Sequence, residues 1–363
     1  MKKILFIASH RPDRAPGQRF RFEQYFSFLE QNGFQCELSF FIAEKEDRIL
    51  YKQGKYFQKA LIAWKAFRIR MGNVFRRNEY DIIFIFREAY LTGSVFFEKT
   101  FKKSKAKLVF DFDDAIWHLD VSAGNRRFSF LKNPGKTGYI ISLCDMVFAG
   151  NQYLADYAGK YNRNVVIIPT TIDTAEYAPL PKMNDNAITI GWSGSITTIK
   201  HFEFAVPVLL KLLEKYGDKL KFKVIGDASY RNEALGIKGI GWKREDELKE
   251  LSEFDIGIMP LPDDEWANGK CGLKGLQYMA LEIPTLMSPV GVNTEIIKDG
   301  VNGFLAGEIE EWMEKLSRLI ENSDLRISMG KEARKTVIDH YSVESQKNRY
   351  LKYFRELTGI ANK

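Results

Sequence analysis

Short apolar runs recur along the chain, each followed by polar or glycine residues and separated by helix-like stretches. The runs are almost continuously apolar, which is typical of parallel strands buried on both faces of a sheet. The pattern therefore predicts parallel sheets covered by helices. The runs are KILFIAS, CELSFFI, DIIFIF, KLVFDFDD, DMVFAG and VVIIP in the first half, then AITIGWSG, KFKVIGD, IKGIGW, DIGIMPL, IPTLMSP and GFLAG in the second.

Two such series predict two doubly wound α/β domains facing a cleft. The length of 363 residues fits two domains, each of ~150 to 180 residues. A polar stretch with two prolines, Tyr177–Asn186, is the expected linker. We expect an N-terminal domain at 1–178, a C-terminal domain at 179–340, and a terminal amphipathic helix in 341–363 that packs back on the first domain.

Composition narrows the class of protein. With 45% hydrophobic residues and no apolar run near the ~20 residues that span a bilayer, we expect a soluble cytoplasmic protein. The start, MKKILFIASHRPD, is typical of a first strand rather than a secretory signal. Cys36, Cys144 and Cys271 are far apart and lack metal-ligand spacing, so neither zinc nor a disulfide framework is predicted. The net charge of +7 favours an anionic partner.

Ligands of open α/β sheets collect beyond the carboxyl ends of the strands, so the residues there are informative. Ser193–Lys200 combines glycine with hydroxyl side chains before a helix, which suits a phosphate cradle and equally suits an ordinary capped helix start. The chain lacks Gly-x-Gly-x-x-Gly and the nucleoside triphosphate loop motif after these strands, which disfavours dinucleotide and triphosphate sites.

The stretch NGKCGLKGLQYMALE supplies a second helix start. Lys270 and Lys274 are one turn apart, which predicts that they share a helix face. Lysines in a first turn oppose the helix dipole, so a bound anion there is a reasonable hypothesis; two solvated lysines are the alternative. Asn293, Thr294 and Glu295 follow the next strand, where Glu295 either binds hydroxyls or begins a helix.

The first half also places polar residues after its strands. Each has a plain structural alternative: a solvated basic loop for the arginines, a local ion pair for Arg87 and Glu88, and a structural role for His118. The candidates are Gly17, Arg19 and Arg21 after the first strand, Arg87 and Glu88 after the third, and Asp111, Asp113, Asp114 and His118 with the fourth.

A basic stretch from Arg48 to Arg77 has nine basic residues and no acidic one. Its spacing predicts an amphipathic helix suited to an anionic membrane surface, although a surface helix with a solvated basic face fits as well. No RNA-recognition motif is present, so no nucleic-acid partner is expected. The apolar positions are Leu50, Phe57, Leu61, Trp64 and Met71, with Lys52, Lys55, Lys59 and Arg68 offset from them.

From Asp145 to Leu305 the order of motifs resembles GT-B glycosyltransferases of the family 4 type, the glycosyl transferases group 1. The motifs are DMVFAGNQYLADYAGKYNRNVVIIPTTIDTAEYAP, ITIGWSGS, KFKVIGD, IKGIGWKREDELKELSEFDIGIMPL and GLKGLQYMALEIPTLMSPVGVNTEIIKDGVNGFL. The resemblance covers the N-terminal half more loosely, through the loop HRPDRAPGQRFRFEQYF. It implies a GT-B fold whose second domain binds a nucleotide sugar.

The resemblance also implies roles for individual residues. Gly194 and Ser195 would face the diphosphate, with Thr198 and Lys200 beside them. Gly241 and Trp242 would lie beside the nucleobase, and Glu295 matches a late glutamate of the family. The two paired family glutamates fall on Gly269 and Gln277, a departure that Gln277 could partly offset through its amide, with Lys270, Lys274 or the acids at 263–265 taking over other contacts.

The implied activity is a retaining transfer of a sugar from a UDP- or GDP-sugar to a hydroxyl of a glycan or lipid-linked acceptor, in envelope polysaccharide assembly. Lys270, Lys274, His118 and Asp113 are the candidate catalytic residues, Gly17, Arg19, Arg21, Arg87 and Glu88 the acceptor-side candidates, and no metal or other cofactor is expected. Alternatives are a nucleotide-sugar epimerase or hydrolase, a non-catalytic sugar-nucleotide binder and, disfavoured by its missing glycine motif, a nicotinamide dehydrogenase.

Overall fold

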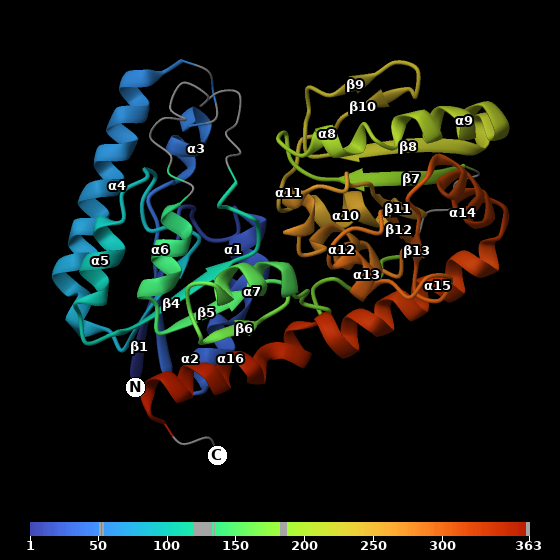
Figure 1. Cartoon of the computed structure of the whole chain (residues 1–363). Helices are drawn as coiled ribbons and strands as arrows, with labels where there is room; N and C mark the ends of the chain where they lie inside the picture. The colour runs from blue at the N-terminus through green and yellow to red at the C-terminus, as the bar shows by residue number, and fades with distance from the viewer. Residues whose placement is uncertain (51, 53, 119–132, 134, 182–186, 361–363) are drawn as a thin grey trace. The chain divides into compact units, whose positions relative to one another are not determined.

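The chain forms two compact units (Figure 1). The computed structural model describes residues 1–50, 52, 54–118, 133, 135–181 and 187–360. Unit 1 consists of Met1–Thr170 together with Gln346–Lys363, and unit 2 is Thr171–Ser345. The chain therefore leaves unit 1, builds the whole of unit 2, and returns to unit 1 with its last helix.

Unit 1 is built on a six-stranded parallel sheet in the order β2-β1-β3-β4-β5-β6. Its register pairs Ile4 with Cys36 on one side and with Ile82 on the other. The strands are β1 (Lys2–Ile7), β2 (Phe34–Ser39), β3 (Ile82–Phe86), β4 (Lys107–Phe112), β5 (Met146–Ala149) and β6 (Val165–Ile167). The helices are α1 (Pro16–Arg21), η1 (Glu23–Tyr25), α2 (Phe26–Gln31), α3 (Glu44–Leu50), α4 (Tyr56–Arg76), η2 (Arg77–Glu79), α5 (Phe96–Lys102), α6 (Lys136–Leu143), α7 (Gln152–Gly159) and α16 (Val343–Thr358).

Aromatic side chains fill the core of unit 1. The Phe6 and Phe84 rings of adjacent strands lie 5.0 Å apart, and Phe354 of α16 lies 5.9 Å from Phe148 and 6.1 Å from Phe84. All four rings are fully buried. Buried aromatic pairs at these separations contribute beyond the area that they bury. The last helix of the chain is therefore part of this core.

Unit 2 has a five-stranded parallel sheet in the order β13-β12-β11-β7-β8. The strands are β7 (Ile188–Ser193), β8 (Leu220–Ile225), β11 (Ile256–Met259), β12 (Thr285–Met287) and β13 (Phe304–Leu305), and β9 (Arg231–Asn232) with β10 (Ile237–Lys238) forms a separate antiparallel hairpin. The helices are α8 (Ile199–Phe202), α9 (Val206–Tyr216), η4 (Gly217–Lys219), α10 (Glu247–Ser252), α11 (Glu265–Asn268), α12 (Leu273–Ala280), α13 (Asn293–Ile296), α14 (Ile309–Glu321), α15 (Ser323–Thr336) and η5 (Val337–Tyr341).

The two predicted doubly wound parallel sheets are confirmed, with one exception among the runs. The run IKGIGW does not add a main-sheet strand: Ile237 and Lys238 pair with β9, and Ile240 makes only a single bridge to Ile225. Its glycines, Gly239 and Gly241, interrupt the apolar run, and glycine weakens a strand interior. This segment instead brings Trp242 to the end of β8.

The division between the units lies at Thr170, whereas the sequence predicted it at 178. Residues 171–177 belong to unit 2 because they bond to its last helices. Arg334 donates to the carbonyls of Thr174 and Tyr177, and the Ile172 N–H donates to the Tyr341 carbonyl. Of the predicted linker at 177–186, residues 182–186 lie outside the described part of the chain.

Candidate functional site

The loops after β7 and β8 meet at the carboxyl edge of the unit 2 sheet. The N–H of Gly194 donates to the Ile225 carbonyl at 2.9 Å. A Cβ on Gly226, whose φ is +129°, would lie 2.2 Å from the Gly194 carbonyl oxygen. Only glycine fits such a conformation and approach. The two loops are therefore fixed against each other.

The hydroxyl side chains of the first loop bond to one another. The Ser195 N–H donates to Thr198 Oγ1 at 2.9 Å, and the Ser195 hydroxyl lies 3.0 Å from Thr197 Oγ1. Ser195 and Lys200 are exposed. The Ser195 side chain can therefore reach a ligand. Helix α8, which follows this loop, has no side-chain cap on its first N–H groups, so the alternative of an ordinary capped helix start is not confirmed.

Three lysines surround a buried histidine next to this loop. His201, on α8, is 2% exposed, and its Nδ1 has no hydrogen-bond partner within the part of the chain that the structure describes. Burial lowers the pKa of His201 to about 4, and the charges of Lys274, Lys270 and Lys200 add to this effect. The three lysine charges thus lie near a histidine that is neutral at pH 7, and the charge of Asp264 partly opposes their effect on its pKa.

Helix α12 brings one predicted lysine to its first turn and leaves the other outside. The helix begins at Leu273 after Gly272, which adopts a left-handed conformation with φ +71°. Lys270 therefore precedes the helix. The prediction that Lys270 and Lys274 share a helix face is wrong, because the left-handed Gly272 interrupts the helical conformation between them. Both side chains lie over indole rings: Lys274 Nζ is 4.3 Å from the Trp192 centroid, and Lys270 Nζ is 5.0 Å from that of Trp266.

Gln277 is almost fully buried on α12 and bonds to other side chains. Its Nε2 donates to Tyr177 Oη at 3.1 Å and to Glu247 Oε1 at 3.2 Å. Trp242, which is half-buried, donates its indole N–H to the same Glu247 oxygen at 2.9 Å. The predicted nucleobase and ribose residues are thus held together by one carboxylate, and Gly241 beside them is exposed.

The segment after β12 carries three candidates, Asn293, Thr294 and Glu295, of which one is buried and two are exposed. Asn293 is buried and donates to the Ser288 carbonyl, and its Oδ1 has no hydrogen-bond partner among the side chains described. A Cβ on Gly272 would lie 3.8 Å from that oxygen, so Asn293 lies at the start of α12. Thr294 and Glu295 are exposed, and the Glu295 charge adds to burial in raising the pKa of Tyr341 to about 12.

Unit 1 gathers an ion-pair cluster at the ends of β3 and β4. Arg87 Nε donates to Asp113 Oδ1 at 2.8 Å, and its Nη2 lies 2.5 Å from Asp114. Burial opposes the charge of Arg87, but the two carboxylates outweigh it and raise the pKa of the guanidinium. Arg87 has φ +63°, a conformation that non-glycine residues rarely adopt outside functional or strained sites. A Cβ on Gly17 would touch Asp113 Oδ2 at 2.8 Å.

The prediction that Arg21 contacts an acceptor is corrected by its burial. Arg21 is 1% exposed and pairs through Nε and Nη2 with Asp111, while its Nη1 donates to the Ile168 carbonyl. Burial raises the pKa of Asp111, and Arg21 opposes that effect. The pair ties α1 to β4 and β6, since an unpaired charge there would be costly. It is a core element of unit 1.

The remaining unit 1 candidates have local surroundings of their own. Arg19 is nearly buried with its guanidinium 4.3 Å from the Phe20 ring. Glu88 forms an ion pair with Lys136 of α6 and not with its neighbour Arg87. His118 is half-buried with its ring 5.4 Å from that of Trp117.

Sequence reasoning missed four residues of these clusters. His10 follows β1, and burial lowers its pKa to about 4, with Arg14, Arg87 and Arg11 adding to the effect against Asp47. Its position directly after a strand was the available signal. His201, Glu247 and Tyr177 were missed because none of them directly follows a strand, and the sequence does not show which side chains they meet. The missed residues are His10, Tyr177, His201 and Glu247.

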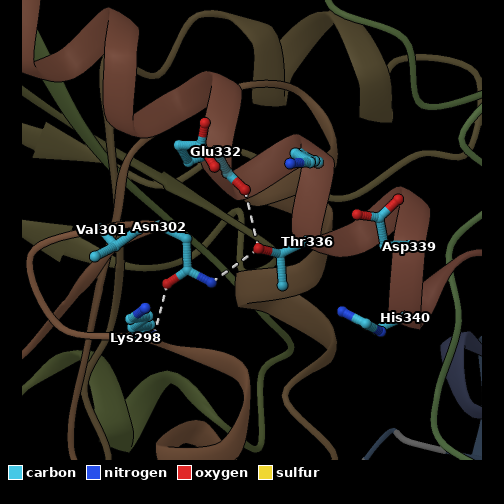
Figure 2. A pocket seen from close by; sticks show the side chains of 8 residues that line it. Lys298, Val301, Asn302, Glu332, Thr336, Asp339 and His340 are labelled. Carbon is cyan, nitrogen blue, oxygen red and sulfur yellow. Dashed lines mark hydrogen bonds between the residues drawn. The ribbon is translucent and has the colours of Figure 1, made fainter.

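A surface pocket of unit 2 lies elsewhere (Figure 2). It is lined by Asn302, Thr336 and His340 among others, and Asn302 donates to Thr336 Oγ1 at 3.0 Å. Residues 298–302 precede β13, so the pocket lies at the amino edge of the sheet, opposite the loops described above. No group of three or more His, Cys, Asp or Glu side chains suited to a metal ion is found among the residues described.

The basic stretch of unit 1 divides into α3 and α4, and the outer face of α4 is aromatic. Phe57 is 76% exposed and Trp64 59% exposed, with Leu61 between them and Phe75 three turns on. Lys59, expected on the polar face, is buried, because α4 packs on unit 1 through the face that carries Lys59, Ile62 and Ala66. In Figure 1, α4 lies along α5 on the flank of unit 1. None of the helices described is both long and apolar enough to span a bilayer.

Residues 187–322 match the family model of the glycosyl transferases group 1. A curated relative from Dictyostelium discoideum, GDP-Man:Man(3)GlcNAc(2)-PP-Dol alpha-1,2-mannosyltransferase, is 28% identical over 114 residues, which are 31% of this chain and 21% of that protein. The chain therefore spans about a fifth of that relative.

Solved structures resemble the chain over nearly all of its length. Sucrose-phosphate synthase from Thermosynechococcus elongatus has a TM-score of 0.70 at 12% identity and covers 99% of this chain and 100% of its own. A glycosyltransferase from Rickettsia africae has a TM-score of 0.67 at 15% identity, with 99% of each chain covered. Anabaena HepE in complex with UDP-glucose has a TM-score of 0.66 at 14% identity and covers 98% of this chain and 100% of its own. These findings show that the chain has the GT-B fold and that residues 187–322 match the glycosyl transferases group 1 family.

Proposed function

We propose that this protein transfers a sugar from a nucleoside diphosphate sugar to a hydroxyl of a glycan or lipid-linked acceptor, with retention at the anomeric carbon and without a metal. The observation that carries the proposal is the pair of lysines, Lys270 and Lys274, whose ammonium groups lie over the Trp266 and Trp192 rings at the start of α12. UDP and GDP are the candidate nucleotides, because a similar structure binds UDP-glucose and a similar protein is named for a GDP-mannose donor.

The difficult part of the reaction is the departure of the diphosphate. The bond between the anomeric carbon and the phosphate oxygen breaks, the acceptor oxygen bonds to that carbon, and the acceptor proton passes to the departing oxygen. Fixed cations stabilise the charge that grows on the diphosphate, because they need no reorganisation during the reaction. Lys274 and Lys270 have this role, and Ser195 offers its exposed hydroxyl beside them.

The donor site is tested by titrating UDP, GDP and ADP, with and without Mg²⁺, into wild type and Lys274→Gln. Lys211→Gln is the matched control, since Lys211 is exposed on α9 in the same unit. We expect metal-independent binding of one diphosphate, weakened about tenfold by Lys274→Gln, which equals ~1.4 kcal/mol. Binding of none of the three would refute the proposal.

The reaction is tested by incubating the protein with the UDP- or GDP-sugar of that nucleotide and a panel of glycan and lipid-linked acceptors. A glycosylated acceptor with retained anomeric configuration is the expected product. Free sugar without acceptor would favour a hydrolase, an altered nucleotide sugar an epimerase, and binding without turnover on any acceptor a sugar-nucleotide binder.

The second part of the proposal places the enzyme on the inner face of an anionic membrane, in envelope polysaccharide assembly. The exposed Phe57, Leu61 and Trp64 repeat at helical spacing on α4, and Lys55 and Arg68 are exposed near them. An apolar face flanked by cations suits an interfacial helix, and each cation near an anionic surface contributes about 1 kcal/mol.

Co-sedimentation with vesicles tests this part. Vesicles of phosphatidylcholine with phosphatidylglycerol should bind the protein, and vesicles of phosphatidylcholine alone should bind it far less. The double variant Phe57→Ser/Trp64→Ser should lose binding, and Ile327→Ser, which changes a 57% exposed residue of α15, should not. Binding by the double variant equal to wild type would refute the membrane role, and concentration-dependent dimerisation lost in that variant would reassign the face to a second copy.

A further inference from the structure

A buried hydrogen-bond network in unit 2 joins four side chains from four separate segments. Tyr177 follows the start of the unit, Trp242 follows the β9–β10 hairpin, Glu247 begins α10, and Gln277 lies in α12. Tyr177 Oη donates to Glu247 Oε2 at 2.6 Å, while Trp242 Nε1 and Gln277 Nε2 donate to Glu247 Oε1 at 2.9 and 3.2 Å. The Glu247 carboxylate is therefore the centre of the network.

This carboxylate is buried and held by donors on both oxygens. Glu247 is 6% exposed, and the Arg244 guanidinium lies 4.0 Å from its Oε2. A buried charge is retained when it is paired and hydrogen-bonded, and removing it leaves its donors without an acceptor. Replacing Glu247 would thus release Trp242 and Gln277 together.

The network fixes the positions of two side chains, Trp242 and Gln277, at the carboxyl edge of the sheet. Trp242 commits its indole N–H to Glu247, so the flat ring is held in one orientation. Gln277 lies three residues after Lys274 in α12, which places the two side chains on neighbouring positions of that helix. A fixed aromatic ring suits stacking of a base, which is sequence-tolerant and contributes about 1–3 kcal/mol in other nucleotide-binding proteins.

We infer that Glu247 is a positioning residue of the donor site, whose carboxylate fixes the Trp242 ring and the Gln277 amide for the nucleoside half of the donor. This inference rests on the proposed function and deepens it. The nucleoside end is recognised by the network around Glu247, and the diphosphate end by the lysines near His201.

The short distances also explain why residue 277 is an amide. A glutamate there would put a second carboxylate about 3 Å from Glu247 in a buried site, where two like charges cannot both remain ionised without a large penalty. One carboxylate and one amide satisfy each other, and exchanging their positions preserves that pair. The exchange still leaves the Trp242 N–H facing an amide N–H, because Trp242 and Gln277 donate to the same Glu247 oxygen. The exchange therefore separates a specific positioning role from general damage to the fold.

The test is calorimetric titration of UDP, GDP and pyrophosphate into wild type, Glu247→Gln, Gln277→Glu and the double exchange Glu247→Gln/Gln277→Glu, with thermal unfolding of each. Glu250→Gln is the control, since Glu250 is one turn further along α10 in a surface pair with Lys223. We expect Glu247→Gln to raise the Kd of the bound nucleotide about tenfold or more, the loss of one such interaction, with the Kd of pyrophosphate unchanged. Gln277→Glu should lower Tm, and the double exchange should restore Tm but not nucleotide affinity, because Trp242 then lacks its acceptor.

The outcomes separate this inference from the proposed function. If wild type binds UDP or GDP and Glu247→Gln binds it equally well, the inference is overturned and the donor site stands. An equal loss of nucleotide and pyrophosphate affinity, or a double exchange that restores nucleotide affinity together with Tm, also overturns it, because the role would then be structural. If wild type binds neither nucleotide, the proposed function fails and the inference fails with it.

Discussion

The close approach of the two loops at the end of β7 and β8 gives a prediction for Gly226→Ala. An added Cβ would lie 2.2 Å from the carbonyl oxygen of Gly194, 2.7 Å from its carbonyl carbon and 3.2 Å from the Ser195 nitrogen. These contacts are with backbone, so no side-chain rotation relieves them. The φ of +129° is also unfavourable for alanine.

The expected destabilisation combines two effects. A strained backbone conformation costs about 1–3 kcal/mol, and overpacking a close contact costs a similar amount. We expect about 3 kcal/mol in total, from the lower part of each range. For a unit of this size each kcal/mol lowers Tm by about 2–4 °C, so Tm of unit 2 should fall by about 6–12 °C.

The assay is differential scanning calorimetry with a parallel nucleotide titration. Nucleotide affinity should fall as well, because displacing Gly194 moves the loop that carries Ser195. Gly241→Ala is the matched control: it lies at the same edge, its Cβ would approach Ala228 Cβ no closer than 3.4 Å, and its Tm should stay near that of wild type. A Gly226→Ala protein with wild-type Tm and wild-type affinity would refute this reasoning.

Three further predictions concern charges. His201 has a pKa of about 4 in the folded protein against an ordinary value of 6.5, so between these pH values the unfolded chain binds a proton that the folded protein does not, and the free energy of unfolding should fall as pH drops from 7 to 4. Urea unfolding at each pH should show a smaller fall in His201→Gln, and the same dependence of the unfolding free energy on pH in both proteins would contradict this. Arg21→Met should cost about 3–5 kcal/mol by leaving Asp111 unpaired, and Arg21→Met/Asp111→Leu should recover much of it; a double variant as unstable as the single one would argue against the pair. Arg87→Gly should be more stable than Arg87→Ala by about 1 kcal/mol, since glycine accepts the left-handed φ of +63°, and equal urea midpoints would oppose this interpretation.

The strands were predictable from sequence because a strand that is buried on both faces of its sheet is almost continuously apolar. Such a run can be recognised without knowing which strands it pairs with. The run DIIFIF became β3 with five buried residues, and DIGIMPL became β11. The exact start of a helix and the face that it buries were harder to predict. Gly272 in a left-handed conformation starts α12 later than the lysine spacing suggested, and α4 packs through the face that carries Lys59, leaving Phe57 and Trp64 exposed.

The site residues were harder to assign, because their partners are distant in sequence. Arg21 and Asp111 are 90 residues apart, and Glu247 reaches Tyr177 and Gln277 across 70 and 30 residues. A single sequence shows that Arg21 follows a strand, but it does not show that Arg21 pairs with the buried carboxylate of Asp111. The strand-end rule thus assigned the candidates to one edge of each sheet, and only the tertiary structure separates ion pairs of the core from exposed side chains.

The return of the chain to unit 1 has a consequence for its synthesis. Tyr350 and Phe354 of α16 are fully buried beside Tyr25, Phe148 and Phe84, and Tyr350 donates to the backbone carbonyl of Arg21. During translation, unit 2 is complete before these residues leave the ribosome. Domains that are continuous in sequence fold as they emerge, the N-terminal one first. Here the order is reversed: the first unit to be translated is the last whose core can close, and until then its aromatic surface must be kept from aggregation.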